Sequence, residues 1–239
     1  ITVIVKLLYK VSILFASHVF FQNSDDKRYF VNSNLVSVDK CSIIPGSGVD
    51  TKKFIPEDFQ NDEIFRFLLV ARVKKDKGVY EYINASKILK EKYNNVEFGL
   101  LGEIGTYNTS ISKQEILKFH NSGTINYIGK TDNVREQLLK TSCVVLPSYR
   151  EGSPRSLMEA MSMKIPVVAT DVPGCRQIVD DSINGFLCKV KDSADLAYNM
   201  EKVINLSEEE RIKMGIMGRR KMINLYDESI VIDQYLDTL

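Results

Sequence analysis

Two glutamates with seven residues between them lie in the stretch YREGSPRSLMEAM, residues 149–161. Glu151 precedes a glycine, a serine and a proline, whereas Glu159 lies inside what reads as a helix. Because a carboxylate accepts hydrogen bonds from two neighbouring hydroxyls, one acid could hold a sugar and the other a ribose. The alternative is that Glu151 is a surface acid and Glu159 a solvated helix residue. This stretch by itself favours the alternative.

The residues between the two acids predict the start of a helix. We expect Ser153 to be the N-cap and Pro154 to occupy the first helical position, where its missing N–H has no cost. The helix would then end near residue 163. The amides that this arrangement leaves free in the first turn are those of Arg155, Ser156 and Leu157. Such amides stabilise an anion at a helix N-terminus.

A basic loop, ARVKKDKG at residues 71–78, follows an apolar run that reads as a strand. Arg72 and Lys77 flank this loop, which ends in Gly78 at the predicted start of a helix. Two cations beside a helix N-terminus form a place for a phosphate or diphosphate. The loop alone leaves a solvated basic turn equally open.

Two further loops carry weaker signals. In LLGEIG, residues 100–105, Gly102 would allow a ligand to approach the backbone closely. In IGKTDN, residues 128–133, Lys130 lies just before a helix for which we expect Asp132 as the N-cap. Backbone groups at such a place can bind the edge of a base. For both loops, taken singly, an ordinary connection from strand to helix is the simpler interpretation.

These loops belong to a regular alternation of strands and helices from about residue 65 onward. The apolar runs that read as strands are residues 65–71, 96–102, 125–129, 143–147, 165–171 and 185–190. Short apolar strands separated by helices predict an α/β fold with a doubly wound, Rossmann-like parallel sheet and helices on both faces. In such a sheet, ligands bind at the carboxyl ends of the strands, where all four loops would lie. The tail from about residue 192 reads as helices.

The first fifty residues do not continue this alternation. They predict a helix (3–16), a strand (18–22), a helix opened by Ser24 and a strand (41–44). Helix capping explains Ser24 and Asp25 in the polar cluster after the first of these strands. One helix and two strands cannot bury their apolar faces by themselves. We therefore expect this stretch to be the end of a preceding domain, in a chain that continues before Ile1.

Composition excludes several classes of protein. The chain has 239 residues, a formal net charge of +1 and 44% hydrophobic residues, which is typical of globular proteins and not of nucleic-acid binders. The cysteines are scattered, which disfavours zinc sites and disulfides and favours a reducing cytoplasm. His18 and His120 have no partners in the sequence that would make a base or a metal ligand. Lys6 and Lys10 interrupt the apolar amino terminus, and the longest uncharged run there is too short to span a bilayer.

Taken together, the motifs resemble the carboxy-terminal, nucleotide-sugar-binding half of retaining GT-B glycosyltransferases, of the type called glycosyl transferases group 1 or family 4. The resemblance covers essentially residues 41–190. It runs through IPGSGVDTKKF, LLVARVKKDKG, FGLLGEIG, INYIGKTDNV and the long stretch from VVLPSYREG to INGFL. Glu151 through Glu159 matches the EX7E motif of that family.

The resemblance implies a role for each matched position. Arg72 and Lys77 would hold the donor diphosphate and stabilise the charge on the leaving group, and Glu151 would contact the transferred sugar. Glu159 would bind the ribose hydroxyls, and the loop at Lys130 would pair with the base. The remaining positions expected to bind substrate are Gly102, Gly152, Ser153 and the backbone amides of Ser156 and Leu157.

The resemblance also implies an activity. The chain would transfer a hexose or N-acetylhexosamine from a nucleotide sugar, UDP-linked by preference, to a glycan or lipid-linked acceptor. Fixed cations and helix amides aimed at the leaving phosphate can replace a metal, so we expect neither cofactor nor obligatory metal. FFQNSDD and IPGSGVD are most similar to the subgroup that extends bacterial surface polysaccharides. A cytoplasmic location at the inner face of the membrane, with peripheral attachment through a missing domain, follows from the same resemblance.

Members of this family have a full amino-terminal acceptor domain, of which we expect only the end here. The expected divisions are the end of that domain (1–45), a linker (46–64), the donor-binding domain (65–220) and a carboxy-terminal helix that packs back on the first domain (221–239). Two alternatives remain. The chain could bind a nucleotide sugar without turnover, or be another GT-B enzyme such as an epimerase or phosphorylase. The EX7E spacing, the basic loop and the lack of a lysine placed for pyridoxal disfavour the last.

Overall fold

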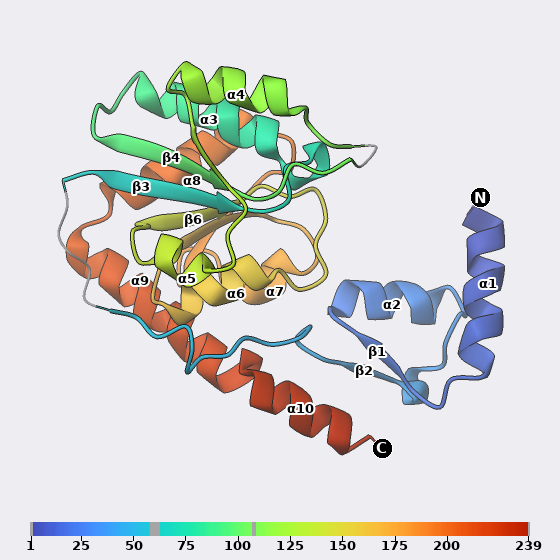
Figure 1. Cartoon of the computed structure of the whole chain (residues 1–239). Helices are drawn as coiled ribbons and strands as arrows, with labels where there is room; N and C mark the ends of the chain where they lie inside the picture. The colour runs from blue at the N-terminus through green and yellow to red at the C-terminus, as the bar shows by residue number, and fades with distance from the viewer. Residues whose placement is uncertain (1, 58–62, 107–108, 239) are drawn as a thin grey trace.

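The computed structural model describes residues 2–57, 63–106 and 109–238, and contains two separate parallel sheets (Figure 1). The larger sheet has six strands in the order β5-β4-β3-β6-β7-β8. Their bounds are β3 (Phe65–Val70), β4 (Val96–Leu101), β5 (Asn126–Gly129), β6 (Cys143–Leu146), β7 (Val167–Thr170) and β8 (Gly185–Cys188). All neighbouring pairs are parallel, so the predicted doubly wound parallel sheet is confirmed.

Helices cover both faces of this sheet because its strands are apolar on both sides. Phe67 and Leu69 point into one core, whereas Leu68 in the same strand points into the other. The first core is covered by α3 (Val79–Lys90), α4 (Lys113–Asn121) and α8 (Ser193–Asn205). The second is covered by α5 (Val134–Leu138), α6 (Arg155–Ser162) and α7 (Cys175–Ile178).

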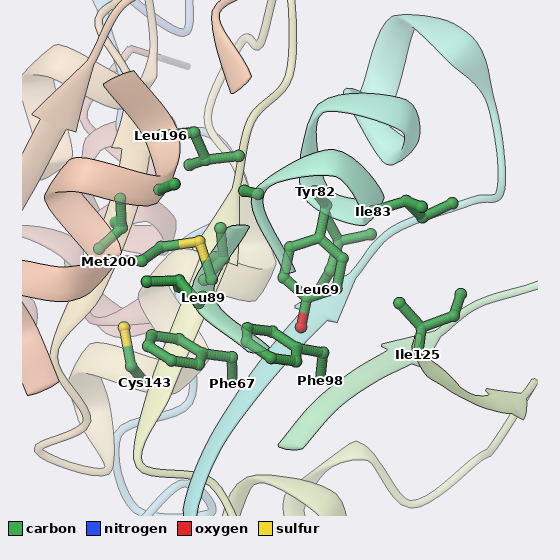
Figure 2. Close-up of a cluster of buried hydrophobic side chains, with 14 of the residues drawn as sticks. Phe67, Leu69, Tyr82, Ile83, Leu89, Phe98, Ile125, Cys143, Leu196 and Met200 are labelled. Atoms are coloured by element: carbon green, nitrogen blue, oxygen red, sulfur yellow. The ribbon is translucent and has the colours of Figure 1, made fainter. Parts of the chain in front are cut away.

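The first core is built around stacked aromatic rings (Figure 2). Phe67 of β3 and Phe98 of β4 lie face to face with their ring centroids 5.4 Å apart. Tyr82 of α3 packs edge-on against Phe98, and Leu196 and Met200 of α8 close the cluster. These rings bind α3 and α8 to the middle of the sheet, which makes the central strands a rigid base for the loops at their ends.

The strand order places the reversal of the sheet between β3 and β6. From β3 the chain adds β4 and β5 on one side, then returns to add β6, β7 and β8 on the other. The loops after β3 and β6 therefore lie side by side, although they are far apart in sequence. Tyr149 N–H donates to the Asp76 carbonyl (2.9 Å), and Gly78 lies so close to the Pro147 carbonyl that a Cβ would overlap it.

The predicted elements are present, but three helix starts differ from the prediction. The N-cap of α2 (Ser24–Asn32) is Asn23, whose side chain accepts from Asp26 N–H (2.8 Å), and not Ser24. The N-cap of α5 is Asn133 and not Asp132. The capping position of α6 is Pro154, one residue after the expected Ser153. For α2 and α5 the two neighbouring residues are both good caps, so residue type does not decide between them, whereas α6 begins after a proline that makes no side-chain cap hydrogen bond.

The smaller sheet belongs to the first fifty residues. It pairs β1 (Val19–Phe21) with β2 (Cys41–Ile43), and α1 (Thr2–Leu14) and α2 pack beside it (Figure 1). A small cluster around Phe21, Val36 and Cys41 forms its core. The apolar side chains of α1 are mostly exposed. Within the described residues, no helix combines the length and the apolar character needed to cross a membrane.

Two segments connect the small sheet to the large one, and they pair with each other. Val49 N–H donates to the Tyr226 carbonyl (2.8 Å), and Glu228 N–H donates back to the Val49 carbonyl (3.1 Å). The second segment continues α9 (Glu208–Lys221) through a π-helical turn, Met222–Tyr226, into α10 (Glu228–Leu236). At its far end α10 reaches the small sheet, where the rings of Tyr235 and Phe20 have centroids 4.7 Å apart.

Candidate functional site

A cavity of about 530 Å³ lies at the carboxyl edge of the large sheet, where the order of its strands reverses. It is bordered by the loop after β3, the loop after β6 and the start of α6. Five of the predicted site residues line it, namely Arg72, Lys77, Glu151, Ser156 and Glu159. The strand order therefore brings together the basic loop and the two acids. From the sequence, we expected only that they lie at the same edge of the sheet.

Lys77 and Glu151 contact each other directly in this cavity. The Lys77 ammonium donates to Glu151 Oε1 at 2.5 Å, and the two side chains are 18% and 12% exposed. Partial burial makes such a pair stronger than one in open solvent, because solvent screens it less. Glu151 is therefore neither a free sugar contact nor a solvated surface acid in this structure, because it is paired with a lysine. An entering phosphate would compete with Glu151 for the same ammonium.

The loop that carries Arg72 and Lys77 is held in place by its own contacts. A 3-10 turn, Lys75–Lys77, ends at Gly78, which has a φ of +70°. Gly78 is also the N-cap of α3. Asp76 accepts from Thr109 Oγ1 (2.9 Å) and from Lys74 (3.2 Å). Partial burial acts to raise the pKa of Asp76, but these hydrogen bonds outweigh it and leave that pKa below its usual value. Asp76 therefore stays ionised and fixes the loop.

Glu159 is buried in α6, with 9% of its surface exposed, so the interpretation as a solvated helix residue is wrong. Desolvation raises the pKa of its carboxyl group, while the charges of Arg155 and Lys53 partly oppose this. Arg155, one turn earlier, lies 3.5 Å from Glu159 Oε1. A desolvated carboxylate at a cavity wall gains strongly from hydroxyl donors, which is the property that ribose binding requires.

The start of α6 faces the cavity through Pro154, Arg155 and Ser156. Helix geometry leaves the amides of Arg155 and Ser156 without a partner inside the helix. Leu157 N–H donates to the Pro154 carbonyl (3.2 Å), and its side chain is fully buried. The expected free amide at Leu157 is therefore wrong, because the helix starts one residue later and its first turn closes on Pro154.

The remaining predicted residues do not line the cavity. Gly152 and Ser153 lie in the same loop as Glu151 but contact other segments. Gly102 and Lys130 follow β4 and β5, on the outer side of β3. A Cβ at Gly102 would overlap the Ala71 carbonyl, so this glycine serves the packing of two loops, and Lys130 is exposed at the surface.

Sequence reasoning missed two contributors to the cavity wall. Lys53 and Phe54 come from the connecting segment, whose backbone is held by the Arg219 guanidinium through the Phe54 carbonyl (3.1 Å). The end of the loop after β5 and the start of α5 contribute the four residues from Asp132 to Arg135. KKF belongs to the family-like stretch 44–54, which was a usable signal, but the return of this segment to α6 is a tertiary contact.

The structure also describes the residues that could bind metals or form disulfides. In the described ranges, no group of three or more His, Cys, Asp or Glu side chains is arranged to hold a metal ion. The four cysteines are buried free thiols. His18 bonds to Ser42 (3.0 Å) and His120 accepts from Tyr127 N–H (3.2 Å), which are packing roles.

Solved glycosyltransferases share this fold. A glycosyltransferase from Rickettsia africae superposes with a TM-score of 0.84 at 17% identity, over 97% of this chain and 65% of that one. HepE of Anabaena, crystallised with UDP and glucose, superposes with a TM-score of 0.81 at 18% identity, over 98% of this chain and 66% of that one. These similarities confirm the predicted Rossmann-like fold of the GT-B type.

The sequence comparisons identify the family. The N,N'-diacetylbacillosaminyl-diphospho-undecaprenol alpha-1,3-N-acetylgalactosaminyltransferase of Campylobacter jejuni is 30% identical over 246 residues, covering 98% of this chain. The chain spans 62% of the length of that relative. The sequence model of the family "Glycosyl transferases group 1" matches residues 50–221, which include the whole cavity wall. The chain therefore belongs to the glycosyl transferases group 1 family.

Proposed function

We propose that this chain is the donor-binding half of a retaining glycosyltransferase that transfers a hexose or N-acetylhexosamine from a UDP-sugar. The observation that carries the proposal is the meeting of Lys77, Glu151 and Glu159 in one cavity beside the start of α6. A nucleotide sugar requires cations for its diphosphate, here Arg72 and Lys77, and acceptors for its hydroxyls, here the carboxylates of Glu151 and Glu159. The family assignment and the UDP bound to HepE support the same donor.

Each group in the cavity receives a task in this proposal. Arg72 and Lys77 bind the diphosphate, and the amides of Arg155 and Ser156 add donors to it at the positive end of α6. Glu159, desolvated in the wall, accepts from the ribose hydroxyls. Binding of the diphosphate draws Lys77 towards the phosphates, which leaves the Glu151 carboxylate to accept from hydroxyls of the sugar.

The chemistry follows from these positions. The bond between the anomeric carbon and the diphosphate oxygen breaks, and negative charge grows on the departing UDP. Fixed cations and helix amides stabilise that charge without reorganising, which lowers the barrier. The acceptor hydroxyl attacks from the same face, its proton passes to the leaving phosphate, and the anomeric configuration is retained. Arg72, Lys77 and the two helix amides therefore act on the leaving group and not on the nucleophile.

The acceptor is proposed from the relatives and concerns the whole protein, because this chain spans less than two thirds of the Campylobacter enzyme. The name of that enzyme describes a sugar on diphospho-undecaprenol as its acceptor. We extend the general class, a glycan or lipid-linked acceptor, to this protein. That partial coverage favours a second candidate for the chain by itself, namely binding of the nucleotide sugar without turnover.

Calorimetric titration tests the donor site. The probes are UDP and four UDP-hexoses: UDP-glucose, UDP-galactose and the two corresponding N-acetylhexosamine compounds. We expect UDP to bind, and Lys77→Ala to weaken it about tenfold or more because a charge-assisted contact is lost. Lys92→Ala is the matched control, since Lys92 also pairs with a glutamate (2.9 Å to Glu201) but lies outside the cavity. A chain that fails to bind UDP contradicts the proposal and its second candidate alike.

Turnover separates the two candidates. Release of UDP from a bound UDP-hexose, dependent on an added lipid-linked glycan, would establish transfer by this chain. Binding without release would favour the binding module. A product with inverted anomeric configuration would contradict the retaining mechanism while leaving the donor site intact.

A further inference from the structure

We propose that the segment after β1, residues 22–26, which comprises a short loop and the first turn of α2, positions the loop that carries Glu151, and that Asn23 is the positioning residue. The inference rests on the proposed function, in which Glu151 contacts the transferred sugar. Its evidence is independent of that function, because it consists of contacts between the small sheet and the loop after β6. These contacts join segments that follow strands of two different sheets. Figure 1 shows the two sheets.

Asn23 connects two parts of the molecule through its buried side chain. One is the small body, which is the smaller sheet with α1 and α2, and the other is the loop after β6. It is 1% exposed, and its Nδ2 donates to the Gly152 carbonyl at 3.3 Å. Its Oδ1 accepts from Asp26 N–H at 2.8 Å, which caps α2. One side chain therefore begins a helix of the small body and holds the residue that follows Glu151. Nδ2 also donates to Asp26 Oδ2 at 2.9 Å, a bond within the cap, so its contact with the Gly152 carbonyl is the second bond of this amide group and the one that capping does not require.

The segment Glu151–Ser153 is enclosed by three different loops. A Cβ at Gly152 would overlap the side chain of Gln22, from the loop after β1. A Cβ at Gly46, after β2, would meet Ser153 Cβ at 2.6 Å. A Cβ at Gly174, after β7, would meet the Glu151 carbonyl oxygen at 2.7 Å.

Two of these three neighbours belong to the first fifty residues. The backbone around Glu151 is therefore packed from the small body as well as from its own sheet. Enclosure of this kind removes the freedom that a surface loop normally has.

Charged and polar groups hold the same contact at its rim. Arg150 pairs with Asp26 at 2.6 Å, and Arg176 lies 3.7 Å from Asp25. Gln177 Nε2 donates to Ser24 Oγ at 3.0 Å. The first turn of α2 presents acids, and the loop after β6 and the start of α7 present arginines, so the two surfaces are complementary. These rim pairs are exposed and individually weak, whereas Asn23 is buried and directional.

The consequence concerns the carboxylate of Glu151. Its oxygen lies 2.5 Å from Lys77, and its backbone is fixed at the next residue by Asn23. If Asn23 loses its donor, the loop gains freedom and Glu151 spends less time in reach of the sugar. UDP itself, bound by Lys77, Arg72 and Glu159, should be almost unaffected. A structural role alone would instead lower stability and leave the ratio of the two affinities unchanged.

The test compares Asn23→Ser with Asn184→Ser. Serine still caps α2 but is too short to reach Gly152. Asn184 is a matched control, being 1% exposed, accepting from Asp180 N–H at 2.8 Å and donating to the Ile178 carbonyl at 3.4 Å.

Hydrogen exchange is followed by mass spectrometry in the full chain. In Asn23→Ser we expect amides of residues 149–153 to exchange about tenfold faster, with α2 unchanged, and in Asn184→Ser no change there. Equal exchange in residues 149–153 of wild type and Asn23→Ser overturns the inference.

Titration provides the second measurement. In Asn23→Ser we expect the best-bound of the four UDP-hexoses to bind about three- to tenfold more weakly, with UDP unchanged. Combination with Glu151→Gln should add almost nothing, because both act on one contact. An equal loss for UDP and the UDP-hexose, or full additivity, overturns the positioning role. A wild-type chain that does not bind UDP refutes the proposed function and leaves the exchange result to decide this inference.

Gln22→Ala keeps the test valid if Asn23→Ser does not fold. Gln22 is exposed, so its truncation is tolerated, yet its side chain covers Gly152. We expect the same pattern at a smaller size, about twofold in exchange and in UDP-hexose affinity. Exchange in residues 149–153 equal to that of wild type in this variant also contradicts the inference.

Discussion

The loops at the carboxyl edge of the large sheet divide into two pairs with different tasks. The inner loops, residues 71–78 after β3 and 147–154 after β6, carry three charged groups of the cavity, Arg72, Lys77 and Glu151. The outer loops, residues 102–105 after β4 and 130–133 after β5, also contain glycine and lysine. Nevertheless Gly102 packs against a neighbouring loop and Lys130 is exposed. Residue type therefore does not distinguish the two pairs.

Strand order makes the difference. The strands β3 and β6 are neighbours at the point where the strand order reverses. The inner loops that follow them therefore lie side by side. They touch through Gly78 and the Pro147 carbonyl, and Tyr149 adds a hydrogen bond to Glu81 of α3 (2.7 Å). Their charges consequently meet under partial desolvation, where electrostatic interactions are stronger than at the open surface.

The largest expected effect tests the contact between the inner loops. Gly78 and Gly129 both have positive φ, +70° and +86°, so alanine is strained at either position. In addition, Gly78→Ala forces a Cβ into the Pro147 carbonyl, whereas nothing lies within 4 Å of a Cβ at Gly129. We expect the free energy of unfolding in urea to fall by about 3 kcal/mol or more for Gly78→Ala and about 1 kcal/mol for Gly129→Ala. Similar losses in both would show that the inner loops have no special packing.

The second prediction concerns the buried acid of the inner site. The pKa of Glu159 is raised by desolvation, so folding disfavours its charged form at every pH above that raised value. Glu159→Gln should therefore unfold at a higher urea concentration than wild type at pH 7. This gain should shrink as the pH falls through the raised pKa and disappear below the unfolded-state value of about 4.5. UDP should bind about tenfold more weakly to the same variant.

Glu201→Gln is the control with the opposite sign. A hydrogen bond from Lys92 lowers the pKa of Glu201, so this acid stabilises the fold above its unfolded-state pKa. Its replacement should reduce stability at pH 7, and the reduction should be lost as the pH falls through the lowered pKa. If both variants shift stability in the same direction, the contrast between buried and paired acids is wrong.

A third, smaller effect separates a lysine of the cavity wall from a lysine of an outer loop. Lys53 lines the cavity and its charge acts on Glu159, whereas Lys130 does neither. We expect Lys53→Ala to weaken UDP about threefold and Lys130→Ala less than about twofold, as measured by calorimetry. A larger loss of UDP affinity in Lys130→Ala would show that the Lys130 side chain takes part in binding.

The smallest expected effect is that of metal removal. If Arg72, Lys77 and the amides at the start of α6 supply the positive field for the diphosphate, a divalent ion is not required. Affinity for UDP should then be the same within about twofold in EDTA and in magnesium. A requirement for magnesium would show that the inner loops lack enough positive charge on their own.

Much of the fold was predictable because its elements depend on local patterns. Apolar runs of five to seven residues, separated by helical periodicity, placed all six strands of the large sheet within a residue or two. Helix starts were less accurate, since Asn23 and Asn133 each lie next to another acceptable cap, and α6 begins after Pro154 without a side-chain cap hydrogen bond. Local energies at neighbouring positions differ too little to decide a boundary.

The candidate site was predictable in part. Glu151, Glu159, Arg72, Lys77 and Ser156 line the cavity as expected, whereas Gly102, Lys130, Gly152, Ser153 and Leu157 do not. Lys53 and Phe54 were missed because a connecting segment reaches the site through tertiary contacts with Arg219. The acids after β1 read as capping residues, and their contact with Arg150 and Arg176 was not visible in the sequence.

The sequence by itself determined which residue types stand at the carboxyl ends of the strands, because periodicity and turn chemistry act over a few residues. It determined the EX7E spacing, and with it the placement of Glu151 before a helix and Glu159 within it. The tertiary structure decided which of these ends meet. Strand order joined Lys77 to Glu151, burial changed Glu159 from a solvated acid into a desolvated one, and Asn23 reached Gly152 from another sheet. Those outcomes depend on contacts between segments distant in sequence, whose energies no local pattern contains.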